Sequence, residues 1–215
     1  MIRLYRIPWS TNVERVELAL AYKGLPAVAV DVEAADRSAV VAVSGQELVP
    51  VLERDGQVVV DSPAILQFLE AEYPDRPLYP ADPARRAEVD TFVDWFNRVW
   101  KIAPNAIADE LGRDTPDGAL IDAHAAAMAS DLDRFEQLLD GRDFLMGDAV
   151  SAADFVAFPF LKYATLAPDP ADDEVFHHVP HDRQPLGDDH PRLAAWIERV
   201  DALPRTPGGE SGATC

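Results

Sequence analysis

The sequence predicts an α/β domain followed by an all-helical domain. Three observations lead to this prediction. Before residue 75, short runs that alternate apolar and polar residues, as strands do, are interleaved with helical spacing. From Tyr73 to Pro83, four prolines lie within eleven residues, which is typical of a stiff linker. Beyond that linker apolar residues recur only at three- and four-residue steps, so the second domain is expected to contain helices alone.

The first domain, residues 1–75, is predicted to begin with a strand–helix–strand unit. Ile2–Ile7 alternates apolar and polar side chains and ends at a proline. Apolar residues from Val13 onwards follow one helical face until Gly24, a typical residue for a helix C-terminus. Val28–Val32 supplies the second strand. Such a unit has parallel strands joined by a right-handed crossover.

A hairpin and a further helix complete the first domain. Ala34–Val43 predicts a weak helix, and Val49–Glu53 and Gln57–Val60 flank an Arg-Asp-Gly turn that favours a hairpin. Ser62 is then placed as the N-cap of a helix, with a proline at the first helical position. The predicted order of elements is therefore βαβαββα.

The second domain, residues 84–204, is predicted to be a helical bundle. Its apolar positions define helices over 89–107, over 125–139, from 151 onwards and over 193–203. The first of these is expected to kink at Pro104. The tail, residues 205–215, contains little that could pack and is expected to be disordered.

Charge and cysteine content narrow the possible functions. The chain carries 38 acidic and 19 basic residues, a net charge of −19, and such a surface repels nucleic acid and anionic lipid. No segment approaches the roughly 20 apolar residues of a membrane span, and the start lacks the apolar core of a signal peptide. The single cysteine, Cys215, allows no intrachain disulfide and fits a reducing cytosol. We therefore expect a cytoplasmic protein whose partners include neither nucleic acid nor membrane.

Two dipeptides in the first domain point to a binding site. Pro50 stands at the entry of a strand, where it cannot donate a ladder hydrogen bond, and we predict that the Val49–Pro50 bond is cis. The Val49 backbone groups would then be open to an extended peptide, which could pair with them as an extra strand. Asp61-Ser62 opens a helix, where unpaired N–H groups attract an anion. Taken singly, Pro50 could be a strand-entry residue and Ser62 an N-cap, and neither need bind anything.

A third motif, in the helical half, has a structural interpretation. Within FLMGDAVSAADF, residues 144–155, Ser151 and Asp154 have the spacing of a capping box. We assign this motif to the folding of the helical core and not to chemistry.

In their order and spacing, Val49-Pro50, Asp61-Ser62 and segment 144–155 resemble the cytosolic glutathione S-transferase family. The resemblance extends over nearly the whole chain, to about Pro204. It implies a thioredoxin-like fold for the first domain, an all-α C-terminal domain, a homodimer, glutathione as co-substrate and a role in detoxification.

The resemblance also implies how glutathione is held. Val49, turned outwards by the bond to Pro50, would pair with the cysteinyl unit. Ser62 would bind the α-carboxylate through its N–H and hydroxyl, and Asp61 would pair with the α-ammonium group.

One departure from the family pattern concerns the glycyl carboxylate. Relatives usually carry a polar residue just before the Val-Pro pair, where this chain has Leu48. Arg37 and Gln46 are the alternatives for that role, and a thiol other than glutathione stays open.

Catalysis in this family requires a thiolate. A thiol with a pKa near 8.5 is only about 3% ionised at pH 7, and lowering its pKa by about two units ionises about three quarters. Ser10 stands five residues before Arg15-Val16, as a serine does in theta- and zeta-like relatives, so the resemblance implies a bacterial enzyme of the serine type with Ser10 stabilising the thiolate. Asn12 is a second candidate, and Ser10 could instead be only an N-cap.

The aromatic and histidine residues have different predicted roles. Trp9, Trp95 and Trp100 are the candidates for an apolar co-substrate pocket. The histidines of His177-His178-Val-Pro-His181 are predicted to be solvated in a loop, and no metal site is predicted.

The leading hypothesis is a transferase that conjugates glutathione, or a related thiol, to a small hydrophobic electrophile. One alternative is a thiol-dependent isomerase or lyase that uses the same site. The other is a non-enzymatic binding or scaffold protein with the transferase fold, favoured by Leu48 and by the acidic surface.

Overall fold

The computed structural model describes residues 1–168 and 174–205 and contains two compact units. The first comprises Met1–Tyr79 together with the described residues from Leu203 onwards, and the second comprises Pro80–Ala202. The predicted tail lies outside the described residues except for Arg205, which forms an ion pair with Glu14 at 3.0 Å.

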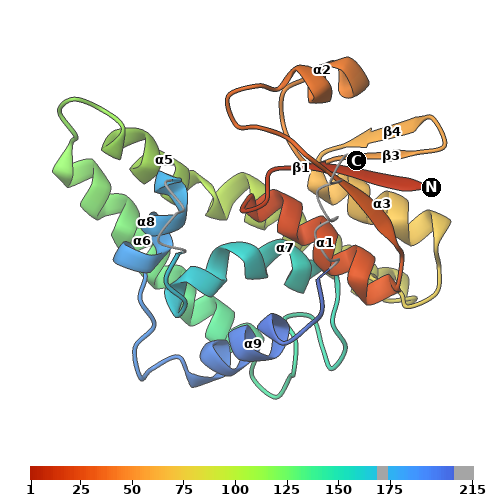
Figure 1. Ribbon diagram of the computed structural model, residues 1–215. Coiled ribbons are helices and arrows are strands. Elements are labelled where there is room, and N and C mark those ends of the chain that lie inside the picture. The colour runs from red at the N-terminus through yellow and green to blue at the C-terminus, as the bar shows by residue number, and fades with distance from the viewer. Residues whose placement is uncertain (169–173, 206–215) are drawn as a thin grey trace. The chain divides into compact units, whose positions relative to one another are not determined.

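The first unit has the predicted βαβαββα order, which confirms the fold class (Figure 1). Its elements are β1 (Ile2–Arg6), α1 (Thr11–Lys23), β2 (Ala27–Asp31), α2 (Ser38–Ser44), β3 (Val51–Arg54), β4 (Gln57–Val60) and α3 (Ser62–Glu72). The strands form one sheet in the order β2-β1-β3-β4. β1 and β2 are parallel, as a crossover through α1 requires, and the other two pairings are antiparallel.

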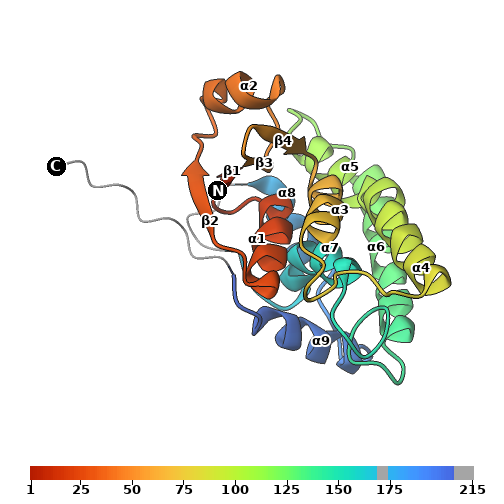
Figure 2. The same ribbon diagram turned by 90° about the vertical axis from the view of Figure 1, so that its right-hand side faces the viewer.

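Successive strand residues point to opposite sides of the sheet. Both faces carry apolar residues, and helices cover both. Leu4 and Leu52, both at most 2% exposed, belong to the face covered by α1 and α3, which lie side by side in Figure 2. Tyr5 and Val51 belong to the other face, where they form a cluster with Val40 of α2.

The register of the strands brings three loops to one end of the sheet. Tyr5, near the end of β1, pairs with Val51, the first residue of β3. Val51 in turn pairs with Val60, the last residue of β4. The chain segments after β1, before β3 and after β4 therefore leave the sheet at the same end, which we call the site end.

A buried lysine holds the start of the linker against the first unit. The side chain of Lys23 has no exposed surface, and its ammonium group pairs with Glu70 at 3.1 Å. The same group donates to the carbonyl oxygens of Tyr73 and Arg76 at 2.7 and 3.1 Å. Lys23 thus satisfies backbone acceptors that a proline-rich segment cannot pair within itself.

The regular elements among the described residues of the second unit are helices, as predicted, apart from one isolated β-bridge between Phe144 and Gly147. The unit consists of α4 (Pro83–Trp95), a π-helical turn (Phe96–Trp100), α5 (Ile102–Leu111), α6 (Gly118–Leu138), α7 (Ala152–Leu161), a short 3-10 turn (Lys162–Ala164), α8 (Val175–Arg183) and α9 (Pro191–Asp201). The expected kink at Pro104 is wrong. The helix changes at the π-helical turn instead, and Pro104 lies in the first turn of α5, where a missing N–H breaks no hydrogen bond.

The histidine segment is also different from the prediction. It forms helix α8 and not a solvated loop. His177 is 3% exposed, and its ring stacks on Tyr163 with centroids 5.2 Å apart. His181 Nδ1 lies 3.3 Å from the carbonyl oxygen of Tyr163. The segment lacks a clear apolar period, and its helix is stabilised by these tertiary contacts.

The predicted capping box is present at the start of α7. Asp154 is completely buried, and its carboxylate accepts hydrogen bonds from the Ser151 N–H at 2.8 Å and the Ser151 hydroxyl at 3.0 Å. It also accepts from the Leu145 N–H at 2.9 Å and from Trp196 Nε1 at 2.8 Å. Burial raises the pKa of Asp154, although these hydrogen bonds act in the opposite direction. The network joins α7, α9 and the preceding loop in the core of the second unit.

Candidate functional site

Ser10 lies at the site end, between β1 and α1. It occupies the N-cap position of α1, and its backbone oxygen accepts from the Glu14 N–H at 3.0 Å. Its side chain makes no capping hydrogen bond. The alternative interpretation of Ser10 requires its hydroxyl to cap α1. The hydroxyl does not do so. Asn12 lies in the first turn of α1 and is partly exposed.

The Val49–Pro50 bond is cis, as predicted. Pro50 is buried and immediately precedes β3. Within the described residues, no hydrogen bond engages the backbone N–H or C=O of Val49. These two groups can therefore receive an extended ligand at the site end.

Asp61 and Ser62 form the third part of the site. Helix α3 begins one residue earlier than predicted, so Asp61 is its N-cap and Ser62 its first residue. Asp61 has φ 71° and ψ 123°, a region that residues other than glycine rarely adopt. Its side chain is exposed, whereas Ser62 is only 2% exposed. Such backbone strain is found mainly where a surrounding site requires it.

Arg15 contacts the candidate site and was not predicted to do so from the sequence. It lies on α1 at 1% exposure, and its Nη1 donates to the Ser62 hydroxyl oxygen at 3.2 Å. Burial lowers the pKa of Arg15 from its ordinary value to about 9, and attraction to Asp61 partly offsets this effect. The guanidinium group is charged at neutral pH. The apolar period of α1 gave no sign of this burial, because Arg15 does not lie on the helical face that Val13 and Val16 share.

The two alternatives to Leu48 behave differently. The Gln46 amide folds back on its own loop, accepting from the Leu48 N–H and donating to the Leu48 carbonyl oxygen at 2.8 Å. Gln46 is thus engaged already. Arg37 donates through Nε to the Ala34 carbonyl oxygen at 2.9 Å and lines a hollow beside α2. Leu48 itself is 76% exposed.

The three tryptophan candidates lie in different environments. Trp9 is 53% exposed and directly precedes Ser10. Trp100 is 1% exposed and stacks on Phe96 with centroids 4.4 Å apart, so it belongs to the core of the second unit and offers almost no surface to a ligand. Trp95 is partly exposed and lines a groove in the second unit.

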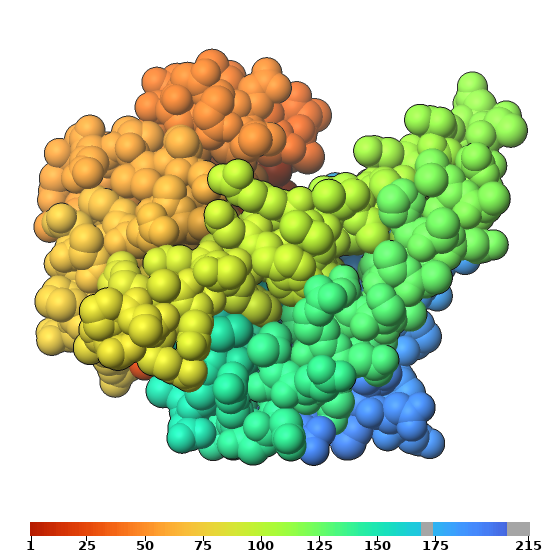
Figure 3. All heavy atoms as spheres, turned by 180° about the vertical axis from the view of Figure 1, so that it is seen from behind, coloured from red at the N-terminus to blue at the C-terminus, as the bar shows by residue number. Residues whose placement is uncertain are grey.

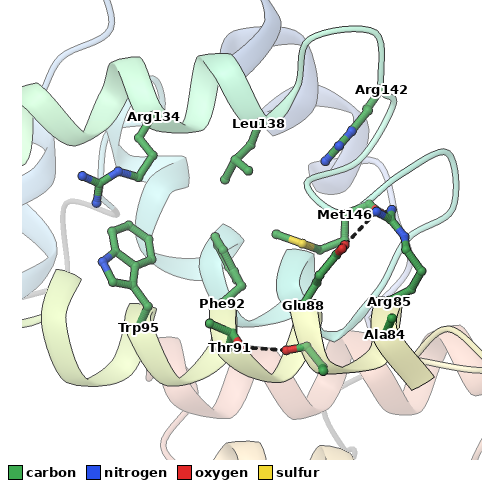
Figure 4. Close-up of a pocket in the computed structure, with 11 residues that line it drawn as sticks. Ala84, Arg85, Glu88, Thr91, Phe92, Trp95, Arg134, Leu138, Arg142 and Met146 are labelled. Atoms are coloured by element: carbon green, nitrogen blue, oxygen red, sulfur yellow. Dashed lines mark hydrogen bonds and ion pairs between the residues drawn. The ribbon is translucent and has the colours of Figure 1, made fainter. Parts of the chain in front are cut away.

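The groove, of about 680 Å³, lies between α4 and α6, which adjoin on the face shown in Figure 3. Figure 4 shows an apolar floor beside charged residues, including the guanidinium of Arg134, which stands over the Trp95 ring at 5.0 Å. Arg85 donates to the Met146 carbonyl oxygen at 2.5 Å, and Arg142 also lines the groove. Three arginines thus gather around an apolar surface on an acidic chain.

Two kinds of feature are absent from the described residues. No group of histidine, cysteine, aspartate and glutamate in them is placed to hold a metal ion. None of the helices they form has the length and apolar character needed to span a membrane.

Both halves of the chain are similar to known proteins. Residues 4–77 match the glutathione S-transferase N-terminal domain, and residues 118–199 match the glutathione S-transferase C-terminal domain. The glutathione S-transferase GstB of Escherichia coli (strain K12) is 30% identical over 174 residues, which are 75% of this chain and 82% of that protein. The maleylpyruvate isomerase of Ralstonia sp is 38% identical over 92 residues, 41% of this chain and 43% of that protein, so the match spans less than half of it.

A solved structure gives the same result. A glutathione S-transferase from Rhodospirillum rubrum F11 matches with a TM-score of 0.75 at 30% identity, covering 96% of this chain and 90% of that one. Both domain types are matched in the same order as the two units of the fold, with Ser10, Val49 and Ser62 at one end of the first sheet. The chain therefore belongs to the glutathione S-transferase family of enzymes.

Proposed function

We propose that this chain is a glutathione transferase of the serine type that conjugates glutathione to a small hydrophobic electrophile. Ser10 donates a hydrogen bond to the glutathione sulfur and stabilises its thiolate, while the thiol proton passes to solvent. The thiolate forms a carbon–sulfur bond with the electrophile, and the leaving group departs with its bonding pair. Asn12 is the second candidate for the same donor role.

One observation carries this proposal: three groups with unused hydrogen-bonding capacity lie at the same end of one sheet. The Ser10 hydroxyl caps no helix, and the Val49 backbone groups have no partner within the described chain. The N–H of Ser62 is likewise without a partner in that part of the chain. A thiol peptide could place its sulfur, its central backbone and its α-carboxylate on these three groups, and its α-ammonium on Asp61.

Trp9 is the proposed contact for the electrophile. It is half exposed, adjoins Ser10 in the sequence and carries a large apolar ring on the segment that leaves the sheet at the site end. Trp95 faces a separate groove, and the burial of Trp100 removes it from this role.

The test begins with calorimetric titration of the wild-type chain with glutathione, followed by conjugation assays with aryl halides and epoxides. We expect Ser10→Ala to lower kcat/KM about 25-fold, because the ionised fraction of the thiol at pH 7 falls from about three quarters to about 3% as its pKa returns to about 8.5. The pH at which half the bound thiol absorbs as thiolate should rise in the same variant. Ser130→Ala, on the surface of α6, is the matched control. Failure of the wild-type chain to bind glutathione would contradict the proposal and favour a scaffold role.

A second candidate is a thiol-dependent isomerase acting through the same residues. The similarity to the maleylpyruvate isomerase of Ralstonia sp favours it. Product analysis separates the two activities, because an isomerase returns glutathione unchanged, whereas a transferase consumes one thiol for each product formed.

The proposal includes a homodimer in the cytoplasm. The arginines of the α4–α6 groove suit an acidic surface of a second copy, since the chain carries a net charge of −19. We expect Arg142→Glu to shift sedimentation towards the monomer, and Arg183→Glu, on an exposed site of the same unit, to leave it unchanged. A wild-type chain that sediments as a monomer at micromolar concentration would contradict this part.

A further inference from the structure

The buried contact between α1 and α3 determines which way the Ser62 hydroxyl can act. Arg15 has only N–H donors, and a hydroxyl has one proton and two acceptor lone pairs. Because Arg15 Nη1 donates to the Ser62 oxygen at 3.2 Å, one lone pair is occupied. The hydroxyl proton then points away from the guanidinium group. Ser62 is held as a donor towards the site end.

The same contact places a full positive charge behind the start of α3. Arg15 and Ser62 are 1% and 2% exposed, so little water screens that charge. The partial charge of a helix N-terminus has the same sign, and the two add. A ligand atom that accepts hydrogen bonds from Ser62 therefore meets a field that favours a negative group over a neutral one of the same shape.

We propose that Arg15 is a positioning residue that makes this site selective for an ionised α-carboxylate. Arg15 acts in two ways, by orienting Ser62, which touches the ligand, and by its positive charge. Arg15 need not contact the ligand itself. The exposed Asp61 beside it supplies the opposite charge. Together they select a zwitterionic amino-acid head group. This inference rests on the proposed function, because the probe is glutathione.

A pair of ligands separates this role from a purely structural one. The first is glutathione, and the second is its analogue in which the α-carboxylate of the γ-glutamyl residue is a carboxamide. Both present an oxygen to Ser62, but only the first is charged. We expect the wild-type chain to bind glutathione about ten times more tightly than the carboxamide, the usual advantage of a charge-assisted hydrogen bond.

Two variants of Arg15 then test the origin of that ratio. Arg15→Gln keeps an N–H donor for Ser62 but removes the charge, and the preference should fall to about twofold or less. Arg15→Lys keeps the charge, and the preference should stay above about fivefold. Arg54→Gln is the matched control, because Arg54 lies at the opposite end of β3 and pairs with Glu72. Thermal unfolding of each variant shows whether it folds.

The outcomes are distinct. A folded Arg15→Gln protein that keeps the tenfold preference, or that weakens both ligands equally, would overturn the inference while leaving the proposed function intact. If Arg15→Gln does not fold, loss of the preference in a folded Arg15→Lys protein overturns it instead. A wild-type chain that binds neither ligand would overturn both this inference and the proposed function.

Discussion

Helices α3 and α7 each begin beside a buried serine and an aspartate, and they differ in how those residues are used. At α7, the Asp154 carboxylate accepts four hydrogen bonds from within the second unit, so the helix start is closed. At α3, the aspartate is exposed at φ 71°, and the serine is held by an arginine that leaves its N–H and its hydroxyl proton for another partner. The start of α7 stabilises a core, whereas we propose that the start of α3 binds a ligand.

The difference shows how a capping motif and a ligand site can be told apart. Both positions have residue types that are favoured at helix N-termini, so composition alone does not separate them. What separates them is the destination of each donor and acceptor. A start whose polar groups are all satisfied internally has nothing left to bind a ligand.

The largest predicted effect is a loss of stability when the hydrogen bonds at the start of α7 are broken. We expect Asp154→Ala to lower the free energy of unfolding by about 4 kcal/mol, because it leaves buried donors of Leu145, Ser151 and Trp196 without an acceptor. Urea denaturation measures the change. Asp148→Ala, in the exposed loop before α7, is the control and should change stability by less than about 0.5 kcal/mol.

The next largest effect is expected when the hydroxyl group is removed from each of the two serines in turn. Ser62→Ala should weaken glutathione binding about tenfold, because a donor to a charged group is lost, and should reduce stability by about 1 kcal/mol. Ser151→Ala should reduce stability by a similar amount, about 1 kcal/mol, and leave binding unchanged. Calorimetry and urea denaturation of both variants check this. Equal losses of affinity would abolish the distinction between the two helix starts.

The smallest predicted effect is a pH dependence of stability. Because burial raises the pKa of Asp154, the folded chain keeps this proton at pH values where the unfolded chain has lost it. Between the unfolded pKa, about 3.9, and the higher folded pKa, this group makes stability fall as pH rises, by at most about 1.4 kcal/mol per pH unit. Asp154→Asn should remove that component of the slope. An identical slope in the two proteins would show that Asp154 titrates normally.

Much of the fold could be predicted because local signals agreed with tertiary structure. Alternation in Ile2–Ile7, the hairpin turn before Gln57 and the glycine at position 24 each act over a few residues, and the elements follow them closely. Helix α8 was missed because its stability comes from buried contacts such as His177 on Tyr163, which leave no period in the sequence. The kink was misplaced because a proline is harmful only beyond the first helical turn.

The candidate site was predictable only in part. Ser10, Val49 and Ser62 could be proposed from motifs, and strand register places them at one end of the sheet. Arg15 could not be assigned a role, since a sequence does not show that a charge on α1 reaches Ser62 on α3, 47 residues later. The burial of Trp100 is likewise a property of packing that aromatic spacing does not reveal.

The backbone of Asp61 limits how this position can change over evolution. At φ 71° and ψ 123°, glycine would relieve the strain and asparagine, which has nearly the same shape as aspartate, would leave it much as it is, so drift towards either would stabilise the chain or leave its stability nearly unchanged. Either change would remove the negative charge beside Ser62. The strained aspartate is thus the state that selection for stability alone would tend to lose, and its persistence in a lineage would record selection for recognition of a cationic amine.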